Sequence, residues 1–148
     1  MKILVIEDDN FKADSISNFL SLKYVNSSII VKTNLAESIE IINLENFNFV
    51  MVDMAIPSHP IVSGEGAPIS FLTGGLDIIL ELNALERSDK CIILTQYPEI
   101  EISGQFYHIN EAKDMIKELL GCSVLGCFEY SENGTNWKTS LENLLDCQ

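Results

Sequence analysis

The chain opens with the stretch KILVIEDD at residues 2–9, in which an apolar run leads directly into three acids. A short uninterrupted apolar run of this kind is typical of a parallel strand that is buried on both faces. The same arrangement recurs at residues 49–53, where Phe-Val-Met-Val precedes Asp53, and at residues 91–95, where Cys-Ile-Ile-Leu precedes Thr95. We therefore expect three buried strands whose ends carry polar side chains.

Amphipathic segments that begin after polar residues suited to helix caps separate these strands. Asp9 or Asn10 is expected to cap the first helix, Asn34 the second and Asn110 the fourth. A third helix is expected around residues 76–82, which carry apolar residues at helical spacing.

The rest of the chain completes an alternating pattern. Further strands are expected at residues 28–31 and 123–130, and the last helix is expected at residues 137–145, after a turn at Asn133-Gly134. A long loop rich in Pro, Gly and Ser is expected at residues 55–75. Residues 96–109 show no clean period and are expected to be irregular.

Strands and helices thus alternate five times, which predicts an α/β fold with helices on both faces of a five-stranded parallel sheet. The expected architecture is a (βα)5 three-layer sandwich. With 148 residues and no visible linker, the chain is expected to form one domain over residues 1–148.

Composition limits the partners of this domain. The formal net charge of −13 repels phosphate backbones and anionic lipids, so we expect no direct binding of nucleic acid or membranes. Neither a membrane span nor a signal-peptide core is visible, and the four cysteines form no CxxC pair. We expect free buried thiols and a cytoplasmic location.

The polar residues after the strands predict a site at one edge of the sheet. Functional groups in such folds gather beyond the carboxyl ends of the strands, which would bring Glu7, Asp8 and Asp53 together. Carboxylates held close to one another repel, which raises a pKa or requires a cation. Mg²⁺ suits this donor set because it binds through one or two carboxylates and retains water ligands.

In these motifs the chain resembles the receiver domain of two-component response regulators, a flavodoxin-like fold with strand order 2-1-3-4-5. The matching motifs are ILVIEDD at 3–9, VDMAIP at 52–57, GLD at 75–77 and IILT at 92–95. The resemblance implies that Asp53 accepts a phosphoryl group from a phosphohistidine. It also implies Mg²⁺ held by Asp8, Glu7, Asp53 and the backbone carbonyl of Ala55, and a phosphate hydrogen bond from Thr95.

Three features depart from the family pattern. The family has a lysine at the end of strand five, but residues 124–131 contain none, and the next lysine, Lys138, lies in the last helix and is expected to point to solvent. The loop at residues 55–75 is long for the family, and is expected to be either a lid or partner-recognition loop or a tolerated surface insertion. Tyr97, close after Thr95, is expected either to act as a switch aromatic or simply to pack over the loop.

The leading hypothesis is a stand-alone receiver, not an enzyme in its own right. It would be phosphorylated by a sensor histidine kinase or phosphotransfer protein, with output through contacts with a separate effector protein. The alternative is a pseudo-receiver that acts as an interaction module without phosphorylation, which the missing lysine favours. A flavin protein or phosphohydrolase on the same fold fits less well, because three acids follow the first strand and Ala55 stands where a second acid is needed.

Overall fold

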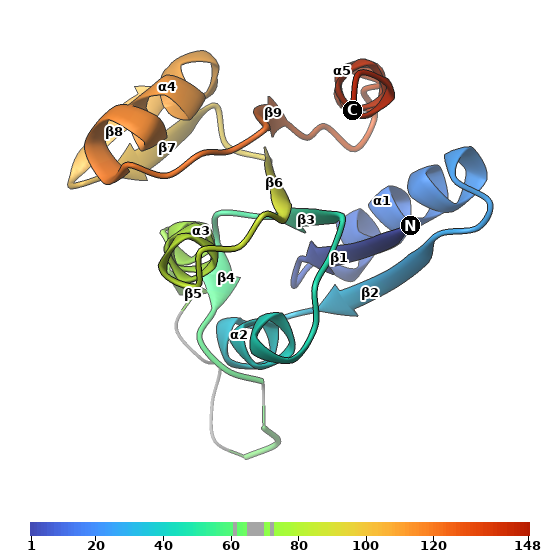
Figure 1. Cartoon of the computed structure of the whole chain (residues 1–148), viewed down its shortest axis with the longest axis horizontal. Helices are drawn as coiled ribbons and strands as arrows, with labels where there is room; N and C mark the ends of the chain where they lie inside the picture. The colour runs from blue at the N-terminus through green and yellow to red at the C-terminus, as the bar shows by residue number, and fades with distance from the viewer. Residues whose placement is uncertain (61, 65–69, 72) are drawn as a thin grey trace.

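The computed structural model describes residues 1–60, 62–64, 70–71 and 73–148. Its centre is a parallel sheet with the strand order β2-β1-β3-β6-β9 (Figure 1). The strands are β1 (Lys2–Ile6), β2 (Ser28–Lys32), β3 (Phe49–Val52), β6 (Lys90–Thr95) and β9 (Gly126–Glu129). Counted among these five alone, the order is 2-1-3-4-5, so the predicted α/β fold class and strand order are confirmed.

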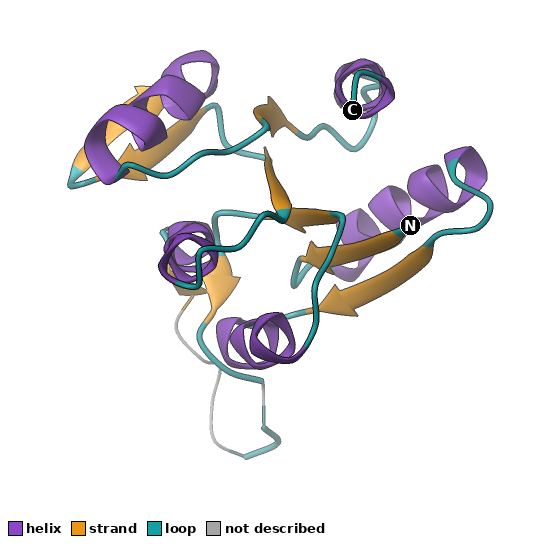
Figure 2. Ribbon diagram, viewed as in Figure 1, coloured by secondary structure: helices purple, strands orange, loops and turns teal. Residues whose placement is uncertain are grey.

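Helices cover both faces of this sheet, which gives three layers (Figure 2). Helices α1 (Asn10–Lys23) and α5 (Asn136–Asp146) lie on one face. Helices α2 (Leu35–Leu44), α3 (Gly74–Ala84) and α4 (Ile109–Leu120) lie on the other. None of the described helices is both long enough and apolar enough to cross a membrane.

The continuous apolar run of β1 follows from its place at the middle of the sheet. Ile3 and Val5 belong to the core under α1 and α5, whereas Leu4 and Ile6 belong to the core on the opposite face. All four side chains are almost completely buried. Since successive side chains of a strand point to opposite faces, a strand covered on both sides needs apolar residues throughout.

Two of the three predicted helix caps are confirmed. The side chains of Asp9 and Asn34 accept backbone amides in the first turns of α1 and α2, at 3.2 and 2.9 Å. The prediction that Asn110 caps α4 is wrong, because His108 occupies the cap position and its Nδ1 accepts the Asn110 amide at 3.2 Å. The helix begins earlier than expected since the chain enters it directly from a strand.

That strand belongs to a hairpin which the sequence reading missed. Residues 96–109 were expected to be irregular, but β7 (Glu99–Ile102) and β8 (Gln105–His108) form an antiparallel pair. The isoleucines of β7 are buried in the core beside α4, and its glutamates alternate with them. Ser103 and Gly104 form the turn with φ of 53° and 81°, as a tight hairpin with positive φ at both central residues requires.

The predicted loop at residues 55–75 also contains paired backbone. Strands β4 (Ile56–Pro57) and β5 (Ser70–Phe71) form a short antiparallel ladder. The prediction of a loop is therefore wrong at these four residues and at Gly74 and Gly75, which begin α3. Its part at residues 61, 65–69 and 72 lies outside the described residues.

The C-terminal part follows the prediction with a shorter strand. Strand β9 covers four of the residues expected at 123–130, and the Gly134 amide donates to the Ser131 carbonyl in the predicted turn at 3.2 Å. Trp137, Leu141 and Leu145 are the buried residues of α5.

The four cysteines are free thiols, as expected, but they are not all buried. Cys91 and Cys122 are buried, whereas Cys147 is exposed. Burial raises the pKa of the Cys127 thiol to about 12, so this group stays protonated and behaves as a small apolar side chain.

Candidate functional site

The backbone brings the ends of β1 and β3 to the same edge of the sheet. The Glu7 amide donates to the Lys32 carbonyl at 2.9 Å, and the Asp53 amide donates to the Ile6 carbonyl at 3.0 Å. These bonds continue the parallel ladder by one residue beyond each strand. The two acids are therefore positioned by rigid backbone and not by mobile loops.

The carboxylates of Glu7, Asp8 and Asp53 gather at this edge. One oxygen atom from each lies within 4.8 Å of the others. Glu7 and Asp53 are buried, with 2 % and 6 % of their surface exposed, whereas Asp8 is exposed. The structure thus brings together the three acids that the sequence placed at strand ends.

A fourth group, which the sequence analysis missed, lies among these acids. The ammonium of Lys12, in the first turn of α1, lies 2.6 Å from Glu7 Oε2 and 3.1 Å from Asp53 Oδ1. The Lys12 side chain is 3 % exposed. A signal was available, because Lys12 lies four and eight residues before Ile16 and Leu20 and so falls on the buried stripe of the helix.

These ion pairs are close in distance but lack the angular geometry of hydrogen bonds. Glu7 Oε2, Lys12 Nζ and Asp53 Oδ1 are enclosed atoms without a hydrogen-bond partner among the described residues. Glu7 Oε1 does have a partner, the Asp9 amide at 2.9 Å, which fixes the orientation of the carboxylate. Buried polar atoms without partners cost free energy, and they concentrate where a protein binds something or performs chemistry.

Burial changes the acidity of this cluster. Loss of solvation raises the pKa of Glu7 to about 7, the nearby Lys12 ammonium opposes the rise, and the Asp53 carboxylate adds to it. The pKa of Asp8 is also raised, mainly by burial of its carboxylate among its neighbours. A bound cation would favour the ionised forms of both groups.

The donor set fits a divalent metal ion. Three carboxylates and one ammonium leave two negative charges uncompensated when all four groups are ionised. Carboxylate oxygens are the hard ligands that Mg²⁺ prefers, and the exposed Asp8 gives an ion access from solvent. The residues present therefore suit Mg²⁺ both in charge and in ligand type.

Thr95 ends β6 on the other side of β3 and is completely buried. Its hydroxyl oxygen accepts the Tyr97 amide at 3.4 Å, a long hydrogen bond. The Thr95 carbonyl accepts the Tyr130 amide at 2.7 Å, which ties the end of β6 to the residue that follows β9.

The residue that follows β9 is aromatic, and β9 itself contains no lysine. The Lys12 ammonium lies 5.5 Å from the centre of the Tyr130 ring, and Tyr130 in turn packs against Trp137 with ring centres 5.2 Å apart. Lys138 lies elsewhere, with its ammonium 5.4 Å from the Trp137 ring, and it forms no ion pair with the acids within the described part of the chain.

Ala55 and Gly75 lie next to the backbone of Asp53 and Met54. Ala55 is half-buried, and the metal-binding role of its carbonyl stays a prediction. The Gly75 amide donates to the Met54 carbonyl at 3.0 Å. A Cβ at Gly75 would lie 2.5 Å from the Asp53 carbonyl oxygen, so only glycine allows α3 to pack this closely against the site.

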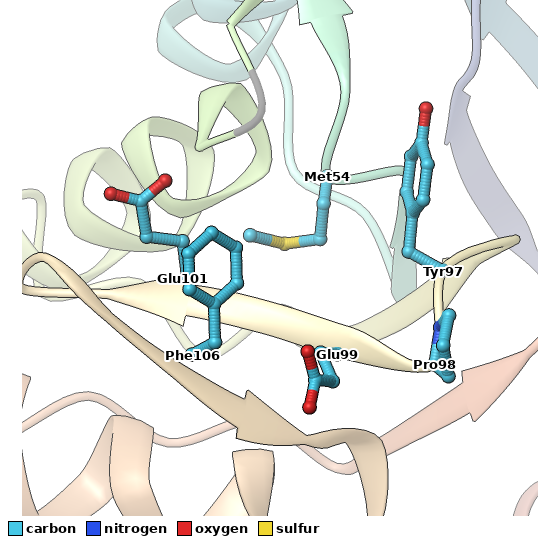
Figure 3. Close-up of a pocket in the computed structure, with 6 residues that line it drawn as sticks. All are labelled: Met54, Tyr97, Pro98, Glu99, Glu101 and Phe106. Atoms are coloured by element: carbon cyan, nitrogen blue, oxygen red, sulfur yellow. The ribbon is translucent and has the colours of Figure 1, made fainter.

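An apolar cavity of about 180 Å³ opens beside Met54, the residue after Asp53 (Figure 3). Figure 3 shows the Met54 side chain extending toward the ring of Phe106, which lies on β8 and is 62 % exposed. The residues that line this cavity are Met54, Tyr97, Pro98, Glu99, Glu101 and Phe106. The hairpin thus forms a partly apolar surface next to the site, with glutamates in its lining.

The chain is similar to a known response regulator protein over nearly its whole length. No protein-family model matches the chain. The Detocs response regulatory protein DtcB of Vibrio alginolyticus is 31 % identical over 140 residues, covering 92 % of this chain and 93 % of that protein.

Solved structures of receiver domains share the fold at low sequence identity. The receiver domain of a putative LuxO repressor protein from Vibrio parahaemolyticus aligns with a TM-score of 0.64 and 16 % identity, over 99 % of this chain and 90 % of that one. The N-terminal domain of a three-domain response regulator from Carboxydothermus hydrogenoformans aligns with a TM-score of 0.63 and 16 % identity, over 99 % and 92 %. With its sheet order, its acidic edge and its relative in Vibrio alginolyticus, the chain belongs to the response regulator receiver family.

Proposed function

We propose that this receiver accepts a phosphoryl group on Asp53 in a reaction that depends on Mg²⁺. The observation that carries the proposal is the buried carboxylate of Asp53, fixed at the end of β3 within 4.8 Å of oxygens of Glu7 and Asp8. Phosphoryl transfer requires little covalent chemistry from a protein, and depends on positioning and on stabilisation of charge. A rigid carboxylate beside a divalent cation site provides both.

Asp8, Glu7, Asp53 and the Ala55 carbonyl would hold the ion. When bound, Mg²⁺ would neutralise charge on the transferring phosphoryl oxygens and orient them. Asp8 is the accessible ligand, while Glu7 is oriented by the Asp9 amide at 2.9 Å.

Thr95 would act as the switch. Its hydroxyl would donate a hydrogen bond to the new phosphoryl group, as the family pattern implies. The same hydroxyl now accepts the Tyr97 amide at 3.4 Å. Rotation of the Thr95 side chain toward Asp53 would therefore break this hydrogen bond and loosen the backbone that leads from β6 into the hairpin. A charge that biases two arrangements of one segment is a common means of changing partner affinity.

The proposed unit is a single domain, residues 1–148, that works in the cytoplasm within a two-component system. Its phosphoryl donor would be a sensor histidine kinase or a phosphotransfer protein, and its output would pass through contacts with a separate effector protein. The net charge of −13 argues against direct contacts with nucleic acid.

A pseudo-receiver is the second candidate, in which the same fold docks a partner without phosphorylation. The observation that favours it is the absence of lysine from β9, together with the Lys12 ammonium that already neutralises part of the acidic cluster.

Intact-protein mass spectrometry after incubation with acetyl phosphate and Mg²⁺ tests the proposal. We expect one phosphoryl adduct that disappears in Asp53→Ala and when the metal is chelated. Asp14→Ala is the matched control, because Asp14 is an exposed aspartate of α1 outside the cluster. No adduct on the folded wild-type protein, with a known receiver reacting in parallel, would reject the proposal in favour of the pseudo-receiver.

A further inference from the structure

Lys12 is a buried cation among the acids of a site whose strand β9 provides no lysine. We propose that the Lys12 ammonium binds the phosphoryl group on Asp53 and so supplies, from helix α1, the cation that β9 lacks. This inference rests on the proposed function and assigns to that site one further residue.

The position of the ammonium carries the argument. Lys12 Nζ lies 3.1 Å from Asp53 Oδ1 and 2.6 Å from Glu7 Oε2. It is nevertheless enclosed without a hydrogen-bond partner among the described residues. An ammonium has three N–H donors, and a phosphoryl group formed on Asp53 brings anionic oxygens to the place where those donors lack acceptors.

The Lys12 side chain is held in this position from both ends. Its backbone amide donates to the Asp9 side chain at 3.2 Å, which fixes the first turn of α1. Its side chain lies on the same buried face as Ile16 and Leu20. At the far end, the ring of Tyr130, the residue that follows β9, lies 5.5 Å from the ammonium, within the range of a cation–π contact.

The ammonium does not replace the metal in this scheme. One ammonium offsets one of the three carboxylates and leaves two negative charges, which one divalent cation balances. The metal and Lys12 would then share the charge of the transferring group. A bond forms between phosphorus and an Asp53 carboxylate oxygen while the bond to the donor's leaving group breaks with its electron pair, and Lys12 transfers no proton.

The test compares Lys12→Met with Lys138→Met in the full chain. Lys138 is the matched control because its ammonium contacts Trp137 and not the acids. With acetyl phosphate at saturating Mg²⁺, we expect Lys12→Met to slow adduct formation by about tenfold or more, the loss of one charge-assisted contact to the phosphoryl group. Calorimetric titration should show Mg²⁺ affinity unchanged or higher in Lys12→Met, since a cation has left the site, and Lys138→Met should match wild type in both measurements.

The outcomes separate this inference from the proposed function. Wild-type rates in Lys12→Met would overturn the role of Lys12 and leave Asp53 as the acceptor. Loss of Mg²⁺ affinity in step with the rate would also overturn it, because a merely structural lysine gives that result. No adduct on wild type would remove the proposed function itself.

A second measurement applies if Lys12→Met does not fold. The wild-type protein can be crystallised with Mg²⁺ and beryllium fluoride, which mimics a phosphoryl group on aspartate. An Nζ within hydrogen-bond distance of a fluoride supports the role of Lys12, and an Nζ that stays with Glu7 alone overturns it.

Discussion

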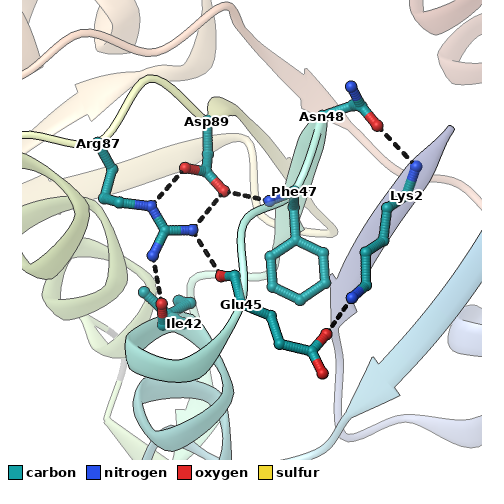
Figure 4. A network of polar contacts seen from close by, with 7 residues as sticks. All are labelled: Lys2, Ile42, Glu45, Phe47, Asn48, Arg87 and Asp89. Carbon is teal, nitrogen blue, oxygen red and sulfur yellow. Dashed lines mark hydrogen bonds and ion pairs between the residues drawn. The ribbon is translucent and has the colours of Figure 1, made fainter.

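Two ion-pair networks lie at opposite ends of the strands of the same sheet, and they are built differently. At the edge where β3 and β6 begin, Arg87 and Asp89 join the loops that precede these strands (Figure 4). Arg87 donates to both Asp89 oxygens, at 2.7 and 2.8 Å, and also to the carbonyls of Ile42 and Glu45. At the other edge, the Lys12 ammonium lies between two carboxylates and makes no hydrogen bond to a described residue.

The difference separates a structural network from a site prepared for a ligand. Arg87 and Asp89 form a bidentate ion pair, and Asp89 also accepts the Phe47 amide at 2.6 Å. A fully connected network of this kind fixes neighbouring segments. The second network leaves buried atoms with unused hydrogen-bonding capacity, which costs stability unless a ligand is bound.

The largest expected effect comes from breaking the Arg87–Asp89 network. Arg87→Met removes the partner of Asp89 and leaves two backbone carbonyls without their donor. We expect the free energy of unfolding to fall by about 4 kcal/mol, measured by urea denaturation. Phosphorylation of the variant should be unchanged under folding conditions. A loss below about 1 kcal/mol would show that this network contributes no more than an ordinary surface pair.

The next effect concerns the pH dependence set by Glu7. Burial raises its pKa in the folded protein from the ordinary value of 4.5 to about 7, so the native state binds this proton more tightly than the unfolded state. Without divalent metal, the Glu7 contribution therefore lowers the free energy of unfolding as pH rises from about 4.5 to about 7 and is constant above that range.

Glu7→Gln removes this titration. The stability of the variant relative to wild type should rise across the same pH window, by at most about 3 kcal/mol. Urea denaturation at several pH values in the presence of a chelator measures the difference. A difference that does not vary with pH would contradict the raised pKa.

A smaller effect on stability is expected from metal binding to the cluster of Glu7, Asp8 and Asp53. Mg²⁺ at about ten times its Kd should increase the free energy of unfolding of wild type by about 1.4 kcal/mol. Asp8→Asn should lose most of this gain, whereas Asp14→Asn, the exposed aspartate outside the cluster, should keep it. An equal gain in both variants would mean that the ion binds elsewhere.

The smallest effect on stability is expected at the exposed end of the Arg87–Asp89 network. The Lys2–Glu45 ion pair in Figure 4 joins side chains that are 36 % and 43 % exposed. Lys2→Gln should therefore change the free energy of unfolding by less than about 0.5 kcal/mol, because water and salt screen such pairs. A larger loss would extend the rigid network beyond Arg87 and Asp89.

Much of the fold could be predicted because its signals are local. The apolar runs before Asp53 and Thr95 show strands that are covered on both faces, and Asn34 marks a helix start through a contact within one turn. The hairpin at residues 99–108 was missed although its glutamates and isoleucines alternate, because four residues are too few to outweigh an irregular surrounding. The strand order came from family resemblance, since periodicity does not specify which strands are neighbours.

The site was predicted in part for the same reason. Glu7, Asp8 and Asp53 were identifiable because each follows a buried strand, and parallel strands end at one edge. Lys12 was not identified, because lysine on a helix ordinarily faces water. Its burial depends on where α1 crosses the sheet relative to the ends of β1 and β3.

The sequence by itself determined the alternation of strands and helices, the two-sided burial of the central strands and the acids at their ends. Each of these follows from side-chain periodicity within a few residues of the chain. Only the tertiary structure decided that an α1 lysine enters the acidic cluster, that the Tyr130 ring lies beside its ammonium, and that a hairpin extends beside the site. These features depend on contacts between segments distant in sequence, and the free energy of burying a charge is set by all of its neighbours together.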